Sequence, residues 1–239
     1  MKYDGYRLPP LISGVLIKRY KRFIADVELD SGEKVTAHCP NSGSMKGCAI
    51  PGAQVWLSKS DNPKRKLKYT WELIKVAGTM IGINTQVPNK LVRQSIENGL
   101  IKELSGYDRV KAEIKTSSHT RLDLLLEKRT GEKCYVEIKN CTLVEDGMAM
   151  FPDAVTLRGQ KHLDELEHLV SLGHRGVIFF LIQRMDARVF KPAAMIDKIY
   201  AEKLKKVKKN GVEVIIKEAS LDTKMIRIGK SIPYERCCS

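Results

Sequence analysis

The segment from Thr120 to Asn140, TRLDLLLEKRTGEKCYVEIKN, restricts the possible folds of this chain more than any other segment. Two apolar, β-prone runs flank a polar stretch, Lys128 to Glu132. Within that stretch, Gly131 can supply the left-handed residue of a three-residue loop, Arg129–Gly131. The segment therefore predicts a β-hairpin.

The register of this hairpin decides which side chains share a face. If Lys128 pairs with Glu132, alternation along the strands places polar side chains on one face and apolar ones on the other. The polar face would carry Asp123 opposite Glu137, and Arg121 opposite Lys139. The apolar face would enter a core and would carry Leu122, Leu124, Leu126, Val136 and Ile138.

Asp123 and Glu137 would then be facing carboxylates with Cβ atoms roughly 5 Å apart. When ionised and partly shielded by protein, they would repel each other by about 3 kcal/mol. Lys139 and Arg121 can offset part of this repulsion, but a hard divalent cation offsets it better. Mg²⁺ held by one or two carboxylates is the usual arrangement at phosphate-processing sites.

This pattern predicts metal-dependent hydrolysis of phosphodiester bonds. Asp123 and Glu137 would bind Mg²⁺ (or Mn²⁺), and Lys139 would steady a water molecule or developing negative charge. The alternative is a surface hairpin with cross-strand ion pairs.

Longer strings around these residues resemble a known family. Asp123 followed by Glu137-Ile138-Lys139 resembles the core of the PD-(D/E)XK nuclease superfamily. More specifically, four strings resemble the sugar fermentation stimulation protein A (SfsA) family: His38 to Met45 (HCPNSGSM), Arg121 to Asp123 (RLD), Val136 to Asn140 (VEIKN) and Phe151 to Leu163 (FPDAVTLRGQKHL). The resemblance covers nearly the whole chain, and it implies an N-terminal OB-like domain, a C-terminal nuclease-like domain and DNA binding.

The charge balance favours a polyanionic partner. Lys and Arg number 42 against 28 Asp and Glu, which gives a net charge of +14 and a pI near 9.5. Nucleic acid, most likely DNA, is the expected partner. The N-terminus carries no secretory signal, and the sequence has no clear membrane-binding helix, so we expect a cytoplasmic protein without a membrane partner. Six cysteines without a C-x-x-C pair argue against a structural zinc site.

Two domains are expected, residues 1–84 and 85–239, in an α/β (α+β overall) chain. In the first, strands within 14–39, 53–60 and 69–77 fit an OB-like β-barrel. In the second, a helix over 90–98 capped by Asn89 precedes a strand over 109–117 and the hairpin. A helix over 154–172, a strand over 177–183, a helix over 193–209 and a strand over 212–218 complete a nuclease-like mixed α/β sandwich.

Other residues are predicted to bind nucleic acid. A basic hairpin tip with Tyr69 and Trp71 behind it could track phosphates and stack bases, or could be a solvated loop; its cations are Lys64, Arg65, Lys66 and Lys68. The small polar loop that carries Ser42, Ser44 and Lys46 either contacts DNA or is structural. A helix N-terminus favours anions, so we expect phosphate contacts from Arg158, Gln160 and Lys161, with Arg121 also holding the phosphodiester chain.

Two further positions stay open. Glu97, near the end of the first predicted helix, either supplies another catalytic acid or faces solvent. His162 has no partner at a metal-ligand spacing, so a structural or solvated role is expected.

Three functions therefore remain. The first is a metal-dependent nuclease. The second is a non-cleaving DNA-binding regulator of sugar (maltose) metabolism genes, suggested by the name of the family. The third, a basic structural or ribosome-associated protein, leaves the Asp123, Glu137 and Lys139 cluster unexplained.

Overall fold

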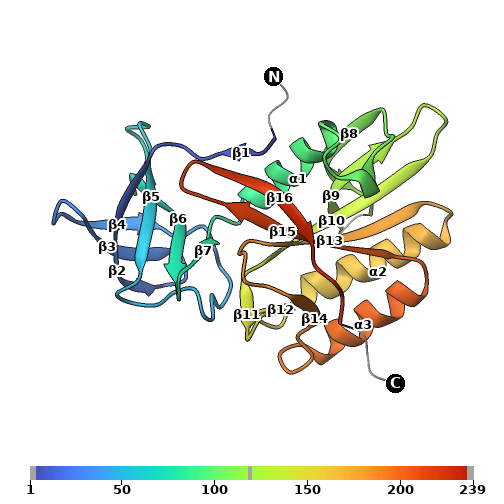
Figure 1. Ribbon diagram of the computed structural model, residues 1–239. Coiled ribbons are helices and arrows are strands. Elements are labelled where there is room, and N and C mark those ends of the chain that lie inside the picture. Colours follow the sequence, from blue (N-terminus) through green and yellow to red (C-terminus); the bar gives the residue numbers. More distant parts are fainter. Residues whose placement is uncertain (1–3, 118–119, 236–239) are drawn as a thin grey trace.

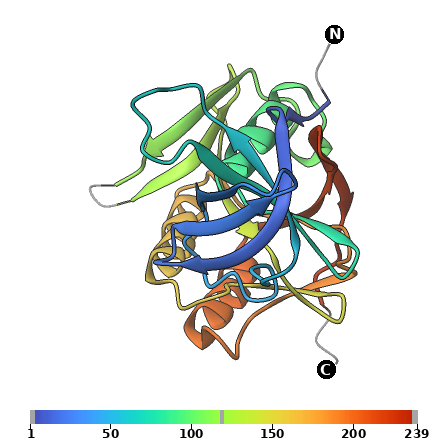
Figure 2. The same ribbon diagram turned by 90° about the vertical axis from the view of Figure 1, so that its left-hand side faces the viewer.

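The computed structural model describes residues 4–117 and 120–235, so Cys237 and Cys238 lie outside the described residues. The chain forms a β-barrel followed by a larger α/β domain, seen side by side in Figure 1. In Figure 2 the barrel lies in front of the α/β domain. No helix in the described ranges is long and apolar enough to cross a membrane.

The barrel is a six-stranded sheet with the strand order β4-β3-β2-β5-β6-β7. Its strands are β2 (Leu11–Tyr20), β3 (Ile24–Leu29), β4 (Lys34–His38), β5 (Gln54–Lys59), β6 (Tyr69–Val76) and β7 (Thr79–Gly82). The sheet closes because β4 also pairs with β6, at Ala37 with Tyr69 and His38 with Thr70. Its interior contains the fully buried Trp71. The predicted OB-like barrel is confirmed, and β7 is an additional strand.

The second domain is built on a seven-stranded mixed sheet with the order β1-β16-β15-β13-β10-β9-β8. Its strands are β1 (Tyr6–Arg7), β8 (Arg109–Lys115), β9 (Arg121–Glu127), β10 (Lys133–Cys141), β13 (Arg175–Ile182), β15 (Glu213–Leu221) and β16 (Met225–Ser231). Central strand β13 runs parallel to both β10 and β15, and nearly all of its residues are buried. This burial explains its continuous apolar sequence.

Helices cover both faces of this sheet. The helices are α1 (Val87–Glu97), α2 (Leu157–Ser171) and α3 (Lys198–Lys209). On one face Leu91 of α1 packs in a core with Val136 and Phe179. On the other face Leu163 of α2 and Leu204 of α3 pack in a core with Phe180. The predicted mixed α/β sandwich is thus confirmed.

Short or irregular elements account for the differences from prediction. A three-stranded sheet of β11 (Leu143–Glu145), β12 (Met148–Phe151) and β14 (Val189–Pro192) and a 3-10 turn (Lys102–Leu104) were not expected. The final predicted strand does not close the sheet, because β16 follows it and pairs with β1 near the N-terminus. Residues 6–7 therefore belong to the sheet of the second domain.

Candidate active site

The hairpin between β9 and β10 has the predicted register over its first half. The backbone N–H of Lys128 donates to Glu132, and the ladder runs from Glu127–Lys133 to Leu124–Val136. Among the described residues the β9–β10 pairing stops there, whereas β9 is paired with β8 on its other side from Glu127 to Arg121. The sequence predicted that Arg121 faces Lys139, and this pairing is wrong because the ladder ends before it.

Asp123 lies at the point where β9 leaves β10. Its Oδ2 accepts the backbone N–H of Ile138 at 2.7 Å, which is the kind of bond a strand carbonyl would make if the ladder continued. Its Oδ1 accepts an N–H of the Asn89 side chain, also at 2.7 Å, from α1. The alternation of side chains between the two faces of β9 is interrupted here. Leu122 therefore packs in the core beneath α2, whereas Leu124 packs in the core on the opposite face.

Glu137 lies on β10 beneath α2 and is only 3% exposed. Its Oε1 accepts a hydrogen bond from Lys139 Nζ at 2.7 Å and also contacts His162 Nδ1. Its Oε2 is buried and has no hydrogen-bond partner in the described part of the chain. Asp123 and Glu137 were expected to share a face, but Asp123 bonds α1 and Glu137 contacts α2, which cover opposite faces. The two carboxylates nevertheless lie near enough for Glu137 to raise the pKa of Asp123.

The charges of the two carboxylates are strongly coupled to their surroundings. Burial, and then the nearby Glu137, raise the pKa of Asp123 to about 6. Burial alone would raise the pKa of Glu137 as well, but Lys139 and His162 together outweigh it and hold that pKa below its ordinary value. Glu137 is therefore the more readily ionised of the two carboxyl groups.

This arrangement fits a divalent cation held by two carboxylates. The described residues contain no group of three or more His, Cys, Asp or Glu side chains that could hold a metal, so water or backbone oxygens would have to complete the coordination. Such partial protein ligation is typical of Mg²⁺. The unpartnered Glu137 Oε2 and the raised pKa of Asp123 are both features that a bound cation would relieve.

Three residues of this cluster escaped prediction or were misassigned. Asn89 is not the helix cap, because α1 begins at Val87 with Pro88 in its first turn, and the Asn89 side chain bonds Asp123 instead. His162 is buried against Glu137, and Arg158 donates from Nε to His162 Nε2 at 3.3 Å. The spacing of Arg158 and His162, four residues apart on one helix, was the available sequence signal.

Two residues that were predicted for the site lie elsewhere. Glu97 forms an ion pair with Arg93 at 2.9 Å, about 12 Å along α1 from Asn89. Gln160 is buried, and its amide donates to both carboxylate oxygens of Asp197 at 3.0 and 3.1 Å. Neither side chain is presented to a substrate at Asp123.

The remaining predicted cations are at the surface. Lys161 is exposed on α2, and Arg121 is exposed and donates to Glu113 at 3.0 Å. In the hairpin tip of the barrel, Arg65 donates to Thr70 at 2.6 Å and the other three cations are exposed: Lys64, Lys66 and Lys68. Trp71 lies in the barrel core and cannot stack on a base.

The small polar loop of the barrel docks onto the second domain. The Ser44 hydroxyl and the Met45 backbone N–H donate to Asp153, at 3.1 and 3.2 Å. Lys46 forms an ion pair with Glu145 at 2.7 Å, while Ser42 is exposed. Asp153 lies just before α2, so the loop fixes the barrel close to the segment that carries Arg158 and His162.

A further surface feature of the barrel was not predicted. The turn between β2 and β3 presents Phe23, which is 50% exposed, directly after Lys21 and Arg22. Both cationic residues have positive φ, 49° and 62°, a backbone conformation that is strained for non-glycine residues. An exposed aromatic ring beside two cations suits stacking on a base and pairing with phosphate.

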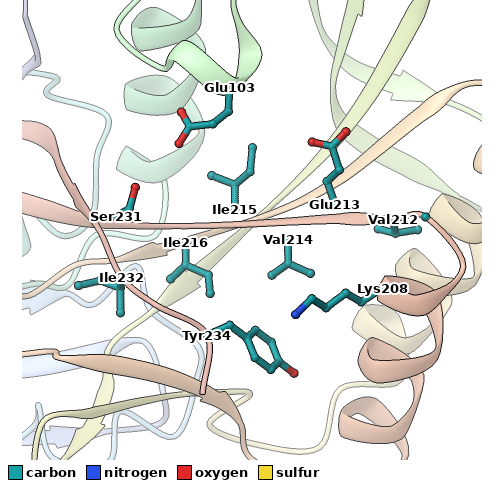
Figure 3. Close-up of a pocket in the computed structure, with 11 residues that line it drawn as sticks. Glu103, Lys208, Val212, Glu213, Val214, Ile215, Ile216, Ser231, Ile232 and Tyr234 are labelled. Carbon is teal, nitrogen blue, oxygen red and sulfur yellow. The ribbon is translucent and has the colours of Figure 1, made fainter. Parts of the chain in front are cut away.

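A pocket of about 570 Å³ lies away from this cluster, on the edge of β15 (Figure 3). Its walls combine Glu103, Lys208 and Glu213 with aliphatic side chains of β15. Asp123, Glu137 and Lys139 do not line it. The pocket is therefore separate from the candidate active site.

The fold and the site together define a class: an OB domain followed by a restriction-endonuclease-like domain. Residues 17–83 match the family description "SfsA N-terminal OB domain", and residues 86–225 match "Sugar fermentation stimulation protein RE domain". The chain belongs to the sugar fermentation stimulation protein (SfsA) family.

Relatives support this assignment along the whole chain. A sugar fermentation stimulation protein homolog of Geobacter sulfurreducens is 54% identical over 224 residues, which cover 94% of this chain and 96% of that protein. The homolog of Geotalea daltonii is 52% identical over 228 residues, covering 95% and 98%. The structure of Pyrococcus furiosus SfsA in complex with Ca²⁺ is similar with a TM-score of 0.89 at 28% identity, covering 98% of this chain and 100% of that one.

Proposed function

We propose that this protein is a metal-dependent nuclease that hydrolyses phosphodiester bonds in DNA. The observation that carries the proposal is the position of Asp123 in the gap between β9 and β10, next to Glu137 and Lys139. A protein that only binds nucleic acid has no need to keep an acid whose pKa is raised by burial and then by a second acid nearby.

Each residue has a distinct role in this proposal. Asp123 and Glu137 would hold Mg²⁺ or Mn²⁺, which when bound neutralises phosphate charge and acidifies a water molecule. Lys139, whose side chain is 11% exposed, donates from its ammonium group to the attacking water or to a phosphate oxygen. Asn89 holds Asp123 in place from α1. The structure of the Pyrococcus furiosus relative in complex with Ca²⁺ supports divalent cation binding by this family member too.

The DNA chain would be held by cations on both domains. On the second domain these are Arg121, Arg158 and Lys161, and on the barrel they are the exposed lysines of the hairpin tip together with the Lys21–Phe23 turn. Lys46 and Ser44 are already engaged by the second domain, so the loop that carries them is proposed to be structural, with Ser42 left to contact phosphate.

Cleavage of labelled single-stranded, duplex and branched DNA tests this function. The purified protein should cut in Mg²⁺ or Mn²⁺ and not in EDTA or Ca²⁺, and Asp123→Asn and Lys139→Met should abolish cutting without abolishing DNA binding. The matched control is Asp61→Asn, an exposed carboxylate in the barrel, which should cut normally. Cleavage that persists in Asp123→Asn would assign the activity to a contaminant or to another site.

One observation favours the second candidate, a DNA-binding regulator that does not cleave. Glu137 is already neutralised by Lys139 and contacted by His162, so the cluster is stable without a metal. For a regulator, the gel shift would be independent of metal and unaffected by Asp123→Asn. Under either function, affinity should fall steeply with salt because phosphate contacts release counterions.

A further inference from the structure

Behind the proposed metal ligands lies a chain of side chains that runs from the exposed Arg158 on α2 through the buried His162 to the buried Glu137 on β10. Arg158 Nε donates to His162 Nε2 at 3.3 Å. The other ring nitrogen, Nδ1, contacts Glu137 Oε1, which also accepts from Lys139 Nζ at 2.7 Å. His162 and Glu137 are 5% and 3% exposed, so water cannot readily replace these contacts.

The chain fixes the tautomer of the histidine. A guanidinium group can only donate hydrogen bonds, so His162 Nε2 must be an acceptor without a proton. In the neutral ring the proton then resides on Nδ1, which donates it to Glu137 Oε1. The 3.2 Å approach of Lys139 Nζ to Nδ1 is a contact between two donors that share one acceptor.

The two carboxylate oxygens of Glu137 have different environments. Oε1 receives both donors, whereas Oε2 is buried with no hydrogen-bond partner among the residues described. A carboxylate held at one oxygen keeps its orientation and presents the other oxygen to a cation. Hydrogen bonds of this kind to ligating groups orient them, and their loss typically weakens metal binding by about 10- to 100-fold.

We propose that Arg158 and His162 are positioning residues for the metal site: Arg158 sets the tautomer of His162, and His162 orients Glu137. The inference rests on the proposed metal-binding function. It assigns the exposed Arg158 a hydrogen bond to the buried His162 as a task, in addition to any contact with phosphate. Sequence spacing supports it, because residues four apart on α2 lie on the same side of the helix.

Metal affinity measured without any cleavage step is the first test. Mn²⁺ binding to the full-length protein is followed by electron paramagnetic resonance of free Mn²⁺, and thermal melts in EDTA confirm folding. We expect His162→Leu to weaken Mn²⁺ binding by about 10- to 100-fold. We expect His162→Asn, whose side-chain amide can donate from near the Nδ1 position, to restore most of that affinity. His168→Leu, at an exposed histidine on the same helix, is the matched control and should bind as wild type.

The tautomer is the second test, and a merely packing role would not affect it. Two-bond ¹H–¹⁵N correlation spectra of the histidine rings should show His162 protonated at Nδ1 in the wild type. Glu137 Oε1 also favours a proton on Nδ1, so Arg158→Ala removes one of two constraints on the tautomer; it should raise the population of the Nε2–H form and weaken Mn²⁺ binding, while Arg158→Lys should retain part of both properties.

The outcomes separate the two proposals. Wild-type protein that binds no Mn²⁺ would overturn the proposed metal-dependent function, and this inference with it. Wild-type protein that binds Mn²⁺, together with a folded His162→Leu variant that binds equally tightly, would overturn the positioning role alone. An Nε2–H tautomer in the wild type would overturn the role assigned to Arg158.

Discussion

Asp123 should destabilise the metal-free protein, and the effect should depend on pH. In the unfolded chain its carboxyl group has an ordinary pKa of 3.8, whereas burial and the neighbouring Glu137 raise the folded pKa to about 6. Between these two values the folded protein binds more protons at Asp123 than the unfolded chain does. The stability contributed by this residue therefore falls as the pH rises through that window.

The size of the effect follows from the shift. About 2 pKa units correspond to about 3 kcal/mol, at 1.36 kcal/mol per unit. This cost is nearly absent below pH 3.8 and complete above pH 6. Asp123→Asn removes the charge and keeps one oxygen for the Ile138 N–H, while its new NH2 group can donate to the side-chain oxygen of Asn89 once that amide turns over. We expect the variant to be more stable than the wild type by up to about 3 kcal/mol at pH 8, and by less than about 1 kcal/mol at pH 4.

Urea unfolding in EDTA, followed by circular dichroism from pH 4 to pH 8, measures this difference. Asp61→Asn, at an exposed position, controls for the loss of one negative charge and should show no such trend. Saturating Mn²⁺ should reverse the order, because a ligand that binds only the folded wild type stabilises it by mass action. A variant that is equally or less stable than the wild type at pH 8 without metal would refute the reasoning.

Three further changes test the fold and the DNA surface. Asp197→Ala leaves two backbone N–H groups and the Gln160 amide without their acceptor, so unfolding in urea should show a loss of about 2 to 4 kcal/mol while DNA affinity is retained. Leu166→Ala, at a fully buried position on α2, should cost about 2 to 5 kcal/mol, whereas Leu172→Ala, at a 59% exposed position, should stay within about 0.5 kcal/mol of wild type in the same assay. Replacing Lys64, Lys66 and Lys68 with glutamine tests the hairpin tip of the barrel. For single-stranded DNA, the slope of log affinity against log salt concentration should become shallower by about 0.7 for each phosphate contact that is lost. An unchanged slope would show that the hairpin tip does not contact DNA.

Much of the fold could be predicted from local patterns. The continuous apolar run of β13 predicted a buried central strand, and the spacing of Leu163, Leu166 and Leu169 predicted the buried stripe of α2. Strands β11, β12 and β14 were missed because each has at most four residues, too few for a pattern to emerge. Strand β16 was missed because it is half exposed and alternates poorly.

The candidate site was harder to predict because its side chains meet through tertiary structure. Hairpin register correctly paired Leu124 with Val136, but it could not show that the β9–β10 pairing ends there while β9 stays paired with β8. The sequence predicted that Asn89 caps the helix, because Pro88 before it suggested a helix boundary. Proline also fits the first turn of a helix, where its missing N–H would have no intrahelical partner, and α1 in fact begins at Val87. His162 could be recognised only once α2 was packed over Glu137.

The end of the β9–β10 ladder couples folding to the proposed chemistry. A sheet that loses one backbone partner must satisfy the exposed N–H in another way, and here the Asp123 carboxylate does so. The same replacement brings an acid next to Glu137, where charge repulsion makes a cation favourable. Asp123→Ala should therefore differ from Asp123→Asn: both remove the charge, but alanine also leaves the Ile138 N–H unpaired, at a cost of about 1 to 3 kcal/mol. If the two variants were equally stable, the N–H would not depend on the carboxylate, and Asp123 would have only an electrostatic role at the site.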